Sequence, residues 1–210
     1  MDRTPTDVDA RLALRLRTLR ADRGLTLEGL AERAGVSRSM ISLIERGESS
    51  PTASVLDRLA TGLGLSLAAL FADEARPDAD PVARRAGQPV WCDPETGYQR
   101  RHLSPLGYPT PIELVEVAFP AGARVAYESA PRGLGISQQV WLLEGEMELT
   151  VGEAVHRLAA GDCLAMRVDR PIAFRNPGDR PARYIVALTT DRARGPAGGA
   201  DPRRREGPPE

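Results

Sequence analysis

The sequence of 210 residues contains no lysine, so all 28 of its basic residues are arginine. It holds only two histidines and two cysteines, and aromatic residues make up 4 % of the chain. Two histidines exclude a metal site built from three histidines of one chain. Two cysteines are too few for the disulfide framework that holds small secreted domains together. The arginine-only basic set is typical of GC-rich coding and indicates no function by itself.

Long hydrophobic runs are also missing, because the apolar segments are only a few residues long and none can span a bilayer. Residues 1–17 lack the apolar block and the small-residue cleavage site of a signal peptide. We therefore expect a protein of the reducing cytoplasm without a membrane partner. Hydrophobic residues at 41 % and charged residues at 27 % are a normal mixture for a globular protein.

Aromatic residues divide the chain into two parts. Phe71 is the one aromatic residue before position 91, and the other eight lie between Trp91 and Tyr184. The composition predicts a flexible N-terminus over 1–8, a helical domain over 9–71, a linker over 72–89, a β domain over 90–191 and a disordered tail over 192–210.

Apolar residues recur at three- and four-residue spacing in five segments of the first domain, which predicts five short helices. Hydroxyl residues suited to N-caps precede the later helices, and glycines suited to C-caps follow the earlier ones. These are Thr26, Ser37, Thr52 and Ser66, and Gly24, Gly35, Gly47 and Gly64. Ala31 is small where two helices cross, and Ile41 and Ile44 point to the core. This spacing is what a helix-turn-helix requires.

With these motifs, residues 11–71 closely resemble the phage-repressor-like helix-turn-helix family, also called the Cro/C1 or XRE type. The resemblance implies that the third helix enters the DNA major groove, with Arg38 paired to a guanine edge. It also implies a salt bridge between Arg20 and Glu45. The DNA-binding residues expected from it are Arg20, Thr26, Ser37, Arg38, Ser39, Ser42, Leu43 and Arg46. The alternative that Arg38 and Arg46 only solvate a surface and that Ser37 is only a cap stays open.

Short alternating segments separated by glycine and proline predict an antiparallel sandwich or small barrel from residue 111 onward. Residues 112–119 form one predicted strand. Residues 138–151 are expected to form a hairpin with its turn at Glu144 and Gly145.

Two blocks of this half, VWLLEGEMELTVG and LAAGD followed by DRPIAFRNPGDRPAR, resemble the cupin family over residues 90–188. The expected fold is thus an α+β multidomain chain, in which an all-α five-helix domain precedes an all-β double-stranded β-helix, or jelly-roll, barrel. Metal-binding cupins carry an acid where this chain has Gln138 and a histidine where it has Ile172. His102 and His156 lie elsewhere, so we expect no metal, no cofactor and no catalytic residue.

The barrel is expected to dimerise and to sense a small molecule in its interior. Arg132 can hold a carboxylate or phosphate near the barrel mouth. The residues expected to bind the ligand are Arg132, Gln138, Trp141, Met147, Met166, Ile172 and Phe174, with Asn176 near the metal position of the family. The alternative that the apolar members are ordinary barrel core stays open.

The predicted function is a sequence-specific DNA-binding transcriptional regulator. It binds a partly palindromic double-stranded operator as a homodimer, and a small-molecule effector shifts its affinity. The net charge of −1 does not oppose this, because residues 11–50 hold eight arginines against five acids. The alternatives are a cupin metalloenzyme of the epoxidase or dioxygenase kind with an accessory helix-turn-helix, and an antitoxin-like DNA-binding partner protein.

Overall fold

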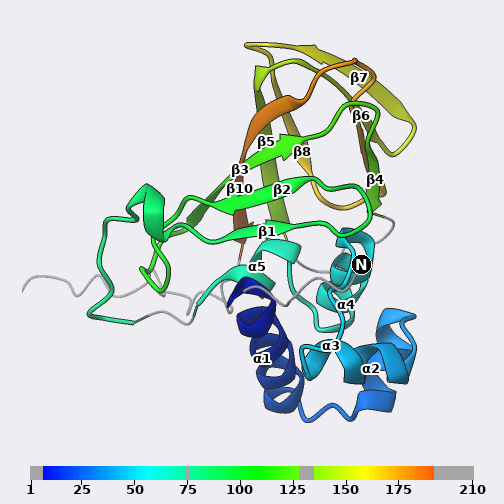
Figure 1. The fold of residues 1–210 in the computed structure, drawn as a ribbon, viewed down its shortest axis with the longest axis vertical. Coiled ribbons are helices and arrows are strands. Elements are labelled where there is room, and N and C mark those ends of the chain that lie inside the picture. Colours follow the sequence, from blue (N-terminus) through cyan, green and yellow to red (C-terminus); the bar gives the residue numbers. More distant parts are fainter. Residues whose placement is uncertain (1–6, 74–75, 128–134, 192–210) are drawn as a thin grey trace, which may run out of the picture.

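Five helices lie beneath two β-sheets in the computed structural model, which describes residues 7–73, 76–127 and 135–191 (Figure 1). The helices are α1 (Asp7–Asp22), α2 (Leu27–Ala34), α3 (Arg38–Glu45), α4 (Ala53–Gly62) and α5 (Leu67–Phe71). A short 3-10 turn, η1 (Arg85–Gly87), follows within the predicted linker. Among the described residues, no helix is both long enough and apolar enough to cross a bilayer.

The helix ends carry the caps that the sequence predicts. At the start of α2, α3, α4 and α5, a hydroxyl side chain accepts a hydrogen bond from the backbone N–H three residues later. Each such bond satisfies a donor that has no partner within its own helix. The capping residues are Thr26, Ser37, Thr52 and Ser66. The glycines at the helix ends, Gly24, Gly35, Gly47 and Gly64, have φ between 62° and 71°.

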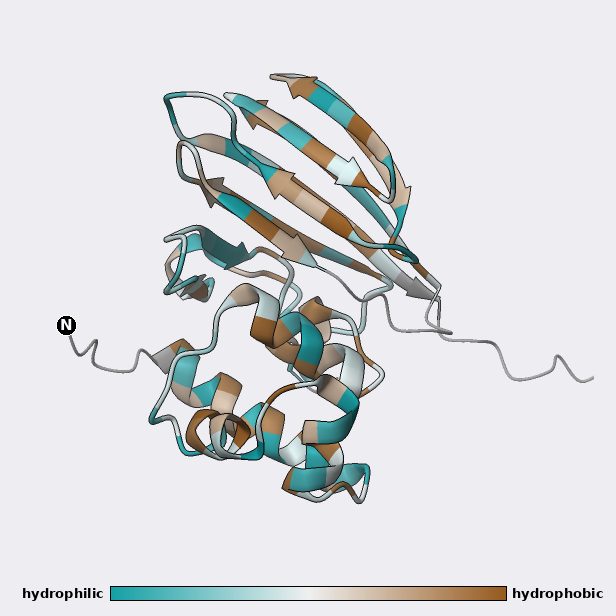
Figure 2. Ribbon diagram, turned by 90° about the vertical axis from the view of Figure 1, so that its right-hand side faces the viewer, coloured by the Kyte–Doolittle hydropathy of each residue, from teal (hydrophilic) through white to brown (hydrophobic). Residues whose placement is uncertain are grey.

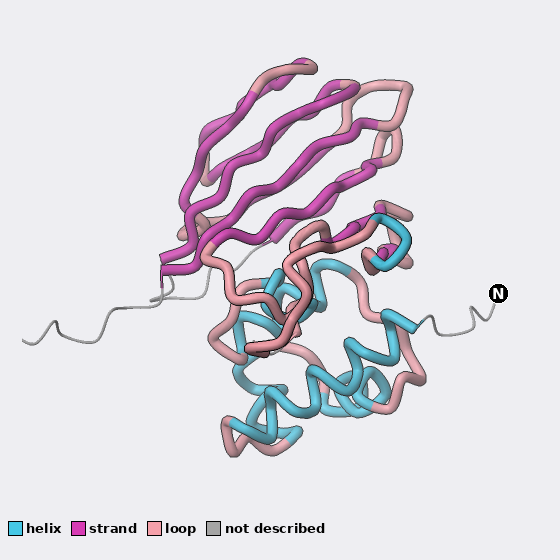
Figure 3. Tube along the Cα trace, turned by 90° about the vertical axis from the view of Figure 1, so that its left-hand side faces the viewer, coloured by secondary structure: helices cyan, strands magenta, loops and turns pink. Residues whose placement is uncertain are grey.

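Ten strands follow in the part of the chain that is described, and they form two antiparallel sheets. They are β1 (Val90–Cys92), β2 (Gln99–His102), β3 (Ile112–Phe119), β4 (Arg124–Tyr127), β5 (Gly135–Glu144), β6 (Glu146–Val151), β7 (Ala154–Ala159), β8 (Cys163–Arg167), β9 (Ile172–Arg175) and β10 (Ala182–Asp191). One sheet has the order β1-β2-β3-β10-β5-β8, and the other has the order β4-β9-β6-β7. The two sheets form the barrel that the cupin resemblance predicts (Figure 3).

The predicted hairpin over residues 138–151 is wrong. β5 pairs with β10 and β8, whereas β6 pairs with β7 and β9, so the two segments belong to different sheets. The chain changes sheet at Gly145, where φ is 80°. A Cβ at this position would lie 2.9 Å from the Cα of Ala182, so the close approach also requires glycine. The Glu-Gly signal therefore marks a crossing between sheets rather than a tight hairpin turn.

Side chains along the barrel strands alternate between the core and the outside, which appears as alternating brown and teal segments in Figure 2. Val140 and Leu142 of β5 are buried on the inner side of the six-stranded sheet. Met147 and Leu149 of β6 are buried on the inner side of the opposite sheet. The barrel is therefore a packed core rather than an open channel.

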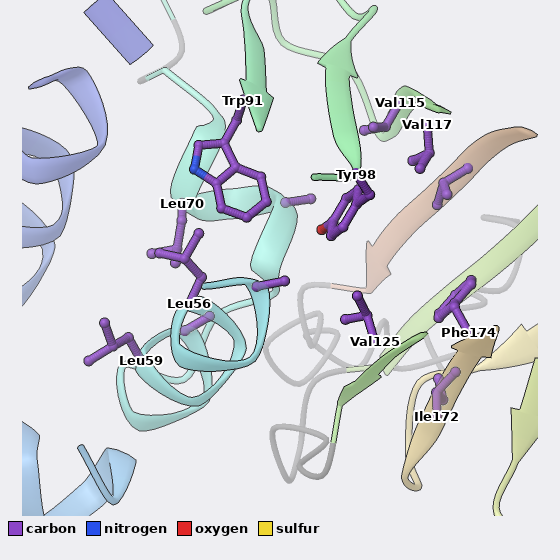
Figure 4. Close-up of a cluster of buried hydrophobic side chains, with 14 of the residues drawn as sticks. Leu56, Leu59, Leu70, Trp91, Tyr98, Val115, Val117, Val125, Ile172 and Phe174 are labelled. Atoms are coloured by element: carbon purple, nitrogen blue, oxygen red, sulfur yellow. The ribbon is translucent and has the colours of Figure 1, made fainter. Parts of the chain in front are cut away.

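The helices and the barrel share one hydrophobic core. Aromatic rings follow one another from Phe71 of α5 through Trp91 and Tyr98 to Phe119 and Tyr184, with centroids 5.5 to 6.2 Å apart. Figure 4 shows Trp91 and Tyr98 between the helices and the barrel strands. The aromatic residues that distinguish the β domain in the sequence therefore also join the β domain to the helical domain.

A residue of the barrel also caps a helix of the other domain. Asp93, in the loop between β1 and β2, is buried, and its Oδ1 accepts a hydrogen bond from the Ala53 N–H at 2.9 Å. Its Oδ2 accepts from the Thr96 N–H at 2.9 Å. A carboxylate is favourable at the N-terminus of a helix, here α4, because the helix dipole is positive there. Residues 72–89 therefore connect two bodies that pack directly against each other.

Candidate DNA-binding surface and barrel cavity

α2 and α3 are joined by a tight turn. The Gly35 N–H donates to the carbonyl of Ala31 at 2.9 Å, and its left-handed conformation lets the chain reverse. Val36 is buried in the turn, and the Oγ of Ser37 accepts from the Met40 N–H at 3.2 Å to begin α3. The structure therefore contains the predicted helix-turn-helix.

α3 has one buried side and one exposed side. Ile41 and Ile44 are fully buried and fix the helix to the core. Arg38 and Ser39 lie on the exposed side, and Leu43 is half-buried. A helix anchored in this way can present polar side chains to the DNA major groove, which is wide enough to admit it.

The two arginines predicted on α3 differ in their partners. The Arg38 side chain is 67 % exposed, and its Nε lies 4.0 Å from the exposed carboxylate of Glu28. Such an exposed pair contributes about 1 kcal/mol or less, so DNA can replace Glu28 as a partner. Arg46 donates to both carboxylate oxygens of Glu48 at 2.7 Å and to Ser42 Oγ at 2.5 Å. These short contacts engage Arg46 and Ser42, whereas the pair of Arg38 with Glu28 is longer, so Arg38 is the more available of the two arginines.

The predicted salt bridge between Arg20 and Glu45 is present. Nε and Nη2 of Arg20 donate to the two carboxylate oxygens at 2.6 and 2.8 Å, and Nη1 donates to the carbonyl of Leu25 at 2.7 Å. The two side chains are only 16 % and 6 % exposed. These contacts use three of the five guanidinium N–H groups and tie α1 to α3, while a DNA contact of Arg20 stays a prediction.

Thr26 and Ser37 are both surface residues, as predicted, and the side chain of each also caps a helix. Both are exposed, and both hydroxyls already serve as helix caps. The first-turn N–H groups of a helix are favourable sites for phosphate. Thr26 therefore stays compatible with the phosphate contact that the resemblance implies.

The residues predicted to bind a ligand in the barrel fall in several places. Gln138, Ile172 and Phe174 line one cavity of about 80 Å³. Met147 is buried in the barrel core, and Met166 borders a separate groove. Arg132 lies outside the described residues.

The prediction for Trp141 is wrong. Its side chain is 50 % exposed on the outer face of the six-stranded sheet. Its neighbours Val140 and Leu142 are buried, and because side chains alternate along a strand, Trp141 must point away from the interior.

The residues at the metal positions of cupins do not fit a metal. Gln138 and Ile172 supply an amide and an alkyl group where the family has a carboxylate and an imidazole. Asn176 is fully buried, but its amide donates to the carbonyls of Phe119 and Arg180 and its oxygen accepts from the Gly178 N–H. Among the described residues, no three His, Cys, Asp or Glu side chains gather in a way that could hold a metal ion.

The histidines lie away from these positions, as predicted. His156 is on β7 and His102 is on β2. Burial, together with the nearby charge of Arg100, lowers the pKa of His102 to about 4, so this imidazole is neutral at physiological pH.

Sequence reasoning did not assign five polar residues to the cavity: Asp57, Ser66, Tyr98, Arg100 and Tyr127. Arg100 lies within the polar segment QRRH, which looks like a solvent-exposed strand. One signal was present: strand alternation places Arg100 and His102 on the same side, and both are buried. Asp57 appears as an ordinary polar position of an amphipathic helix, and only the packing of the barrel against α4 covers it.

Comparison with known proteins agrees with the two-domain fold. Residues 11–72 match the helix-turn-helix domain family, and residues 135–188 match the cupin domain family. The chain is therefore a two-domain protein in which a helix-turn-helix domain precedes a cupin domain.

Relatives that match this chain over most of their length are named as transcriptional regulators. The HTH-type transcriptional regulators SutR and PuuR of Escherichia coli K12 are both 28 % identical, over 82 % and 83 % of this chain and 91 % and 92 % of their own length. The crystal structure of an HTH_3 family transcriptional regulator from Vibrio cholerae has a TM-score of 0.68 and 26 % identity, over 89 % of this chain and 98 % of that one. Together these findings support a DNA-binding regulator with a cupin domain.

Proposed function

We propose that this chain is a sequence-specific transcriptional regulator of the cytoplasm that reads its operator with α3. The observation that carries the proposal is the exposed polar side of α3, with Arg38 available on a helix whose other side is fixed in the core. An arginine in this position can donate two hydrogen bonds to a guanine edge in the major groove. The names of the relatives SutR and PuuR support the same activity.

The regulator acts as a homodimer through the outer face of the six-stranded sheet. Ile112, Leu114 and Trp141 are exposed apolar side chains on this face. On β10, Ala187 lies beside Leu114 and Ile185 lies beside Trp141, so these apolar residues are neighbours, with Glu116 and Gln139 at their border. Contiguous exposed apolar residues mark interaction sites, and the same surface on two copies suits a twofold axis. Two α3 helices would then meet half-sites about 34 Å apart on a partly palindromic operator.

The barrel serves as an effector-binding module and not as a metalloenzyme. An epoxidase or dioxygenase of the cupin type needs metal ligands, and Gln138 and Ile172 supply none at the family positions. Elemental analysis of the purified protein tests this part. We expect no stoichiometric iron, zinc or manganese, and a stoichiometric metal would overturn it.

Selection of bound duplexes from a random-sequence DNA pool tests operator recognition. We expect enrichment of a partly palindromic site with half-sites one helical turn apart, protected by the protein in a footprint. The Arg38→Ala variant should change or lose the enriched site. Arg157→Ala is the matched control, because Arg157 lies on β7 with a side chain 85 % exposed. A pool without enrichment contradicts the proposal.

A further inference from the structure

The cavity of about 80 Å³ lies between the two domains rather than inside the barrel alone. Asp57 of α4 and Ser66, Leu67 and Ala68 at the start of α5 form one wall, and barrel residues form the rest. On the measure in which one water needs about 10–15 Å³, this space has room for about five to eight waters or a small organic molecule. The helix-turn-helix domain therefore forms one wall of this cavity.

Arg100 brings a cation to this cavity and forms no salt bridge among the described residues. Its charge does act on the buried carboxyl of Glu113, partly offsetting the rise in the pKa of Glu113 that burial causes. Arg100 is 8 % exposed, and its Nε and Nη2 are buried with no hydrogen-bond partner in the described part of the chain. Its guanidinium lies 5.6 Å from the centre of the Phe71 ring, which satisfies none of these donors. Buried donors on a cation are costly to leave unpaired, so this site favours an anionic group from outside the protein.

Asp57 brings the opposite charge from the helical wall. Its Oδ2 is buried and also has no hydrogen-bond partner within the described residues. Burial raises the pKa of the Asp57 carboxyl to about 7, so part of it is ionised at neutral pH. A positively charged group beside it would favour the ionised form. Asp57 and Arg100 line the same cavity, yet they form no salt bridge with each other.

The two unpaired groups restrict the charge of a ligand. A simple carboxylate would satisfy Arg100 but would meet the charge of Asp57, and a diamine would satisfy Asp57 but would meet Arg100. The other lining residues include Val117, Phe174 and Val186, which suit an aliphatic group.

We propose that this interdomain cavity binds a small apolar α-amino acid, or a zwitterion of the same kind, with its carboxylate on Arg100 and its ammonium on Asp57. The aliphatic side chain lies toward the barrel interior. This inference rests on the proposed function, because it names the effector class and the route by which the effector reaches the DNA-binding domain. The ligand touches α4 and α5 on one side and barrel strands on the other, so its binding changes how the two domains pack and hence the operator affinity.

Isothermal titration of the wild-type protein with L-valine, L-leucine and L-methionine tests the ligand class. At least one should bind. For the tightest of them, the matched carboxylic acid without the amine and the matched amine without the carboxylate should each bind at least tenfold more weakly. For L-leucine these analogues are 4-methylpentanoic acid and 3-methylbutylamine. Absence of binding by all three amino acids, or equal binding of either analogue, overturns the proposal.

Two variants locate the site. Asp57→Asn and Arg100→Met should each weaken binding of the amino acid at least tenfold, while Arg157→Met, outside the cavity, should bind as the wild type does. If Arg100→Met does not fold, Asp57→Asn and the analogue series still decide the outcome. Unchanged affinity in Asp57→Asn contradicts the proposed geometry.

Operator binding is measured separately, so the two proposals can fail independently. The amino acid should change the operator affinity of the wild type at least threefold and should leave that of Asp57→Asn unchanged at the same concentration. Amino-acid binding without any operator would keep the ligand site and overturn the regulatory function. Operator binding that no amino acid changes would keep the regulator and overturn the effector.

Discussion

The exposed side of α3 and the outer face of the six-stranded sheet are both open surfaces, but their chemistry is opposite. α3 buries its isoleucines and presents Arg38 and Ser39. The sheet buries one set of apolar residues in the barrel and still exposes another, including Leu114 and Trp141. A charged polar surface suits the DNA backbone and base edges, whereas an exposed apolar surface suits another protein surface.

Each of these two surfaces is held in position by the buried residues beneath it. α3 is fixed by buried isoleucines and by the Arg20–Glu45 pair. The outer sheet face is held by β-ladders whose inner side chains form the barrel core. Four variants test the two surfaces and the cavity between the domains.

The largest effect is expected beneath α3. Arg20→Ala should lower the free energy of unfolding by about 3–5 kcal/mol, because it leaves the buried carboxylate of Glu45 without its cation. Urea denaturation followed by circular dichroism measures the loss. The double variant Arg20→Met, Glu45→Met should recover much of it, since no unpaired charge remains. A loss below about 1 kcal/mol in the single variant contradicts the assignment.

The next effect is expected on the sheet face. Trp141→Ala should weaken the homodimer by about 2–4 kcal/mol, the range found when a tryptophan at the centre of an interface is removed. Sedimentation equilibrium measures the dissociation constant. Val155→Ala is the matched control, because Val155 is equally exposed at 56 % but lies on β7 of the other sheet. Equal effects of the two variants would place the interface elsewhere.

A smaller effect is expected at the DNA surface. Arg38→Ala should weaken operator binding by about 1–3 kcal/mol through loss of the guanine contact. Its stability should stay within about 0.5 kcal/mol of the wild type, since the side chain is exposed. Fluorescence anisotropy with the selected operator measures the binding. If Arg38→Ala binds the operator as tightly as the wild type does, α3 is not the reading helix in the way proposed.

The smallest effect concerns the cavity and depends on pH. The pKa of Asp57 rises from 3.8 to about 7 in the folded protein, so between these values the folded state holds a proton that the unfolded state has lost. The contribution of Asp57 to the stability of the wild type therefore falls as pH rises from about 4 to about 7. Asp57→Asn removes this dependence and should be more stable than the wild type at pH 8, by on the order of 1–2 kcal/mol.

At pH 4, the wild type and the Asp57→Asn variant should have similar melting temperatures. His102 has the opposite dependence, because its lowered pKa makes stability fall as pH decreases from about 6.5 to about 4. This residue is present in both proteins, so the difference between their melting temperatures isolates Asp57. A difference that does not change between pH 4 and pH 8 would show that the Asp57 carboxyl keeps its ordinary pKa.

Much of the helical domain could be predicted because its signals are local. A hydroxyl at Thr26 or Ser37 caps the helix that follows directly, and a glycine such as Gly35 ends the helix just before it. The Arg20–Glu45 pair joins residues far apart in sequence, and only the family resemblance predicted it. The motif does not reveal that three of the five Arg20 N–H groups have partners within the domain.

The barrel was harder to predict because its strand partners are remote. The alternation in residues 138–151 identified two strands, but no local feature indicates that they belong to different sheets. Trp141 was placed in the interior although the parity of its own strand puts it outside. The cavity could not be foreseen at all, since Asp57 and Arg100 come from different domains and each has an ordinary polar neighbourhood in the sequence.

By itself, the sequence without lysine and with two histidines determined the two domain types, the helix caps and the loss of the cupin metal ligands, because these depend on residue identity and short spacing. Only the tertiary structure decided that the helical domain forms one wall of the cavity, that Asp93 caps α4, and that Asp57 and Arg100 line this cavity with buried atoms that have no hydrogen-bond partner among the described residues. Those features arise from contacts between residues about 40 positions apart. The energy of such contacts depends on burial, and burial is a property of the packed molecule rather than of any single segment.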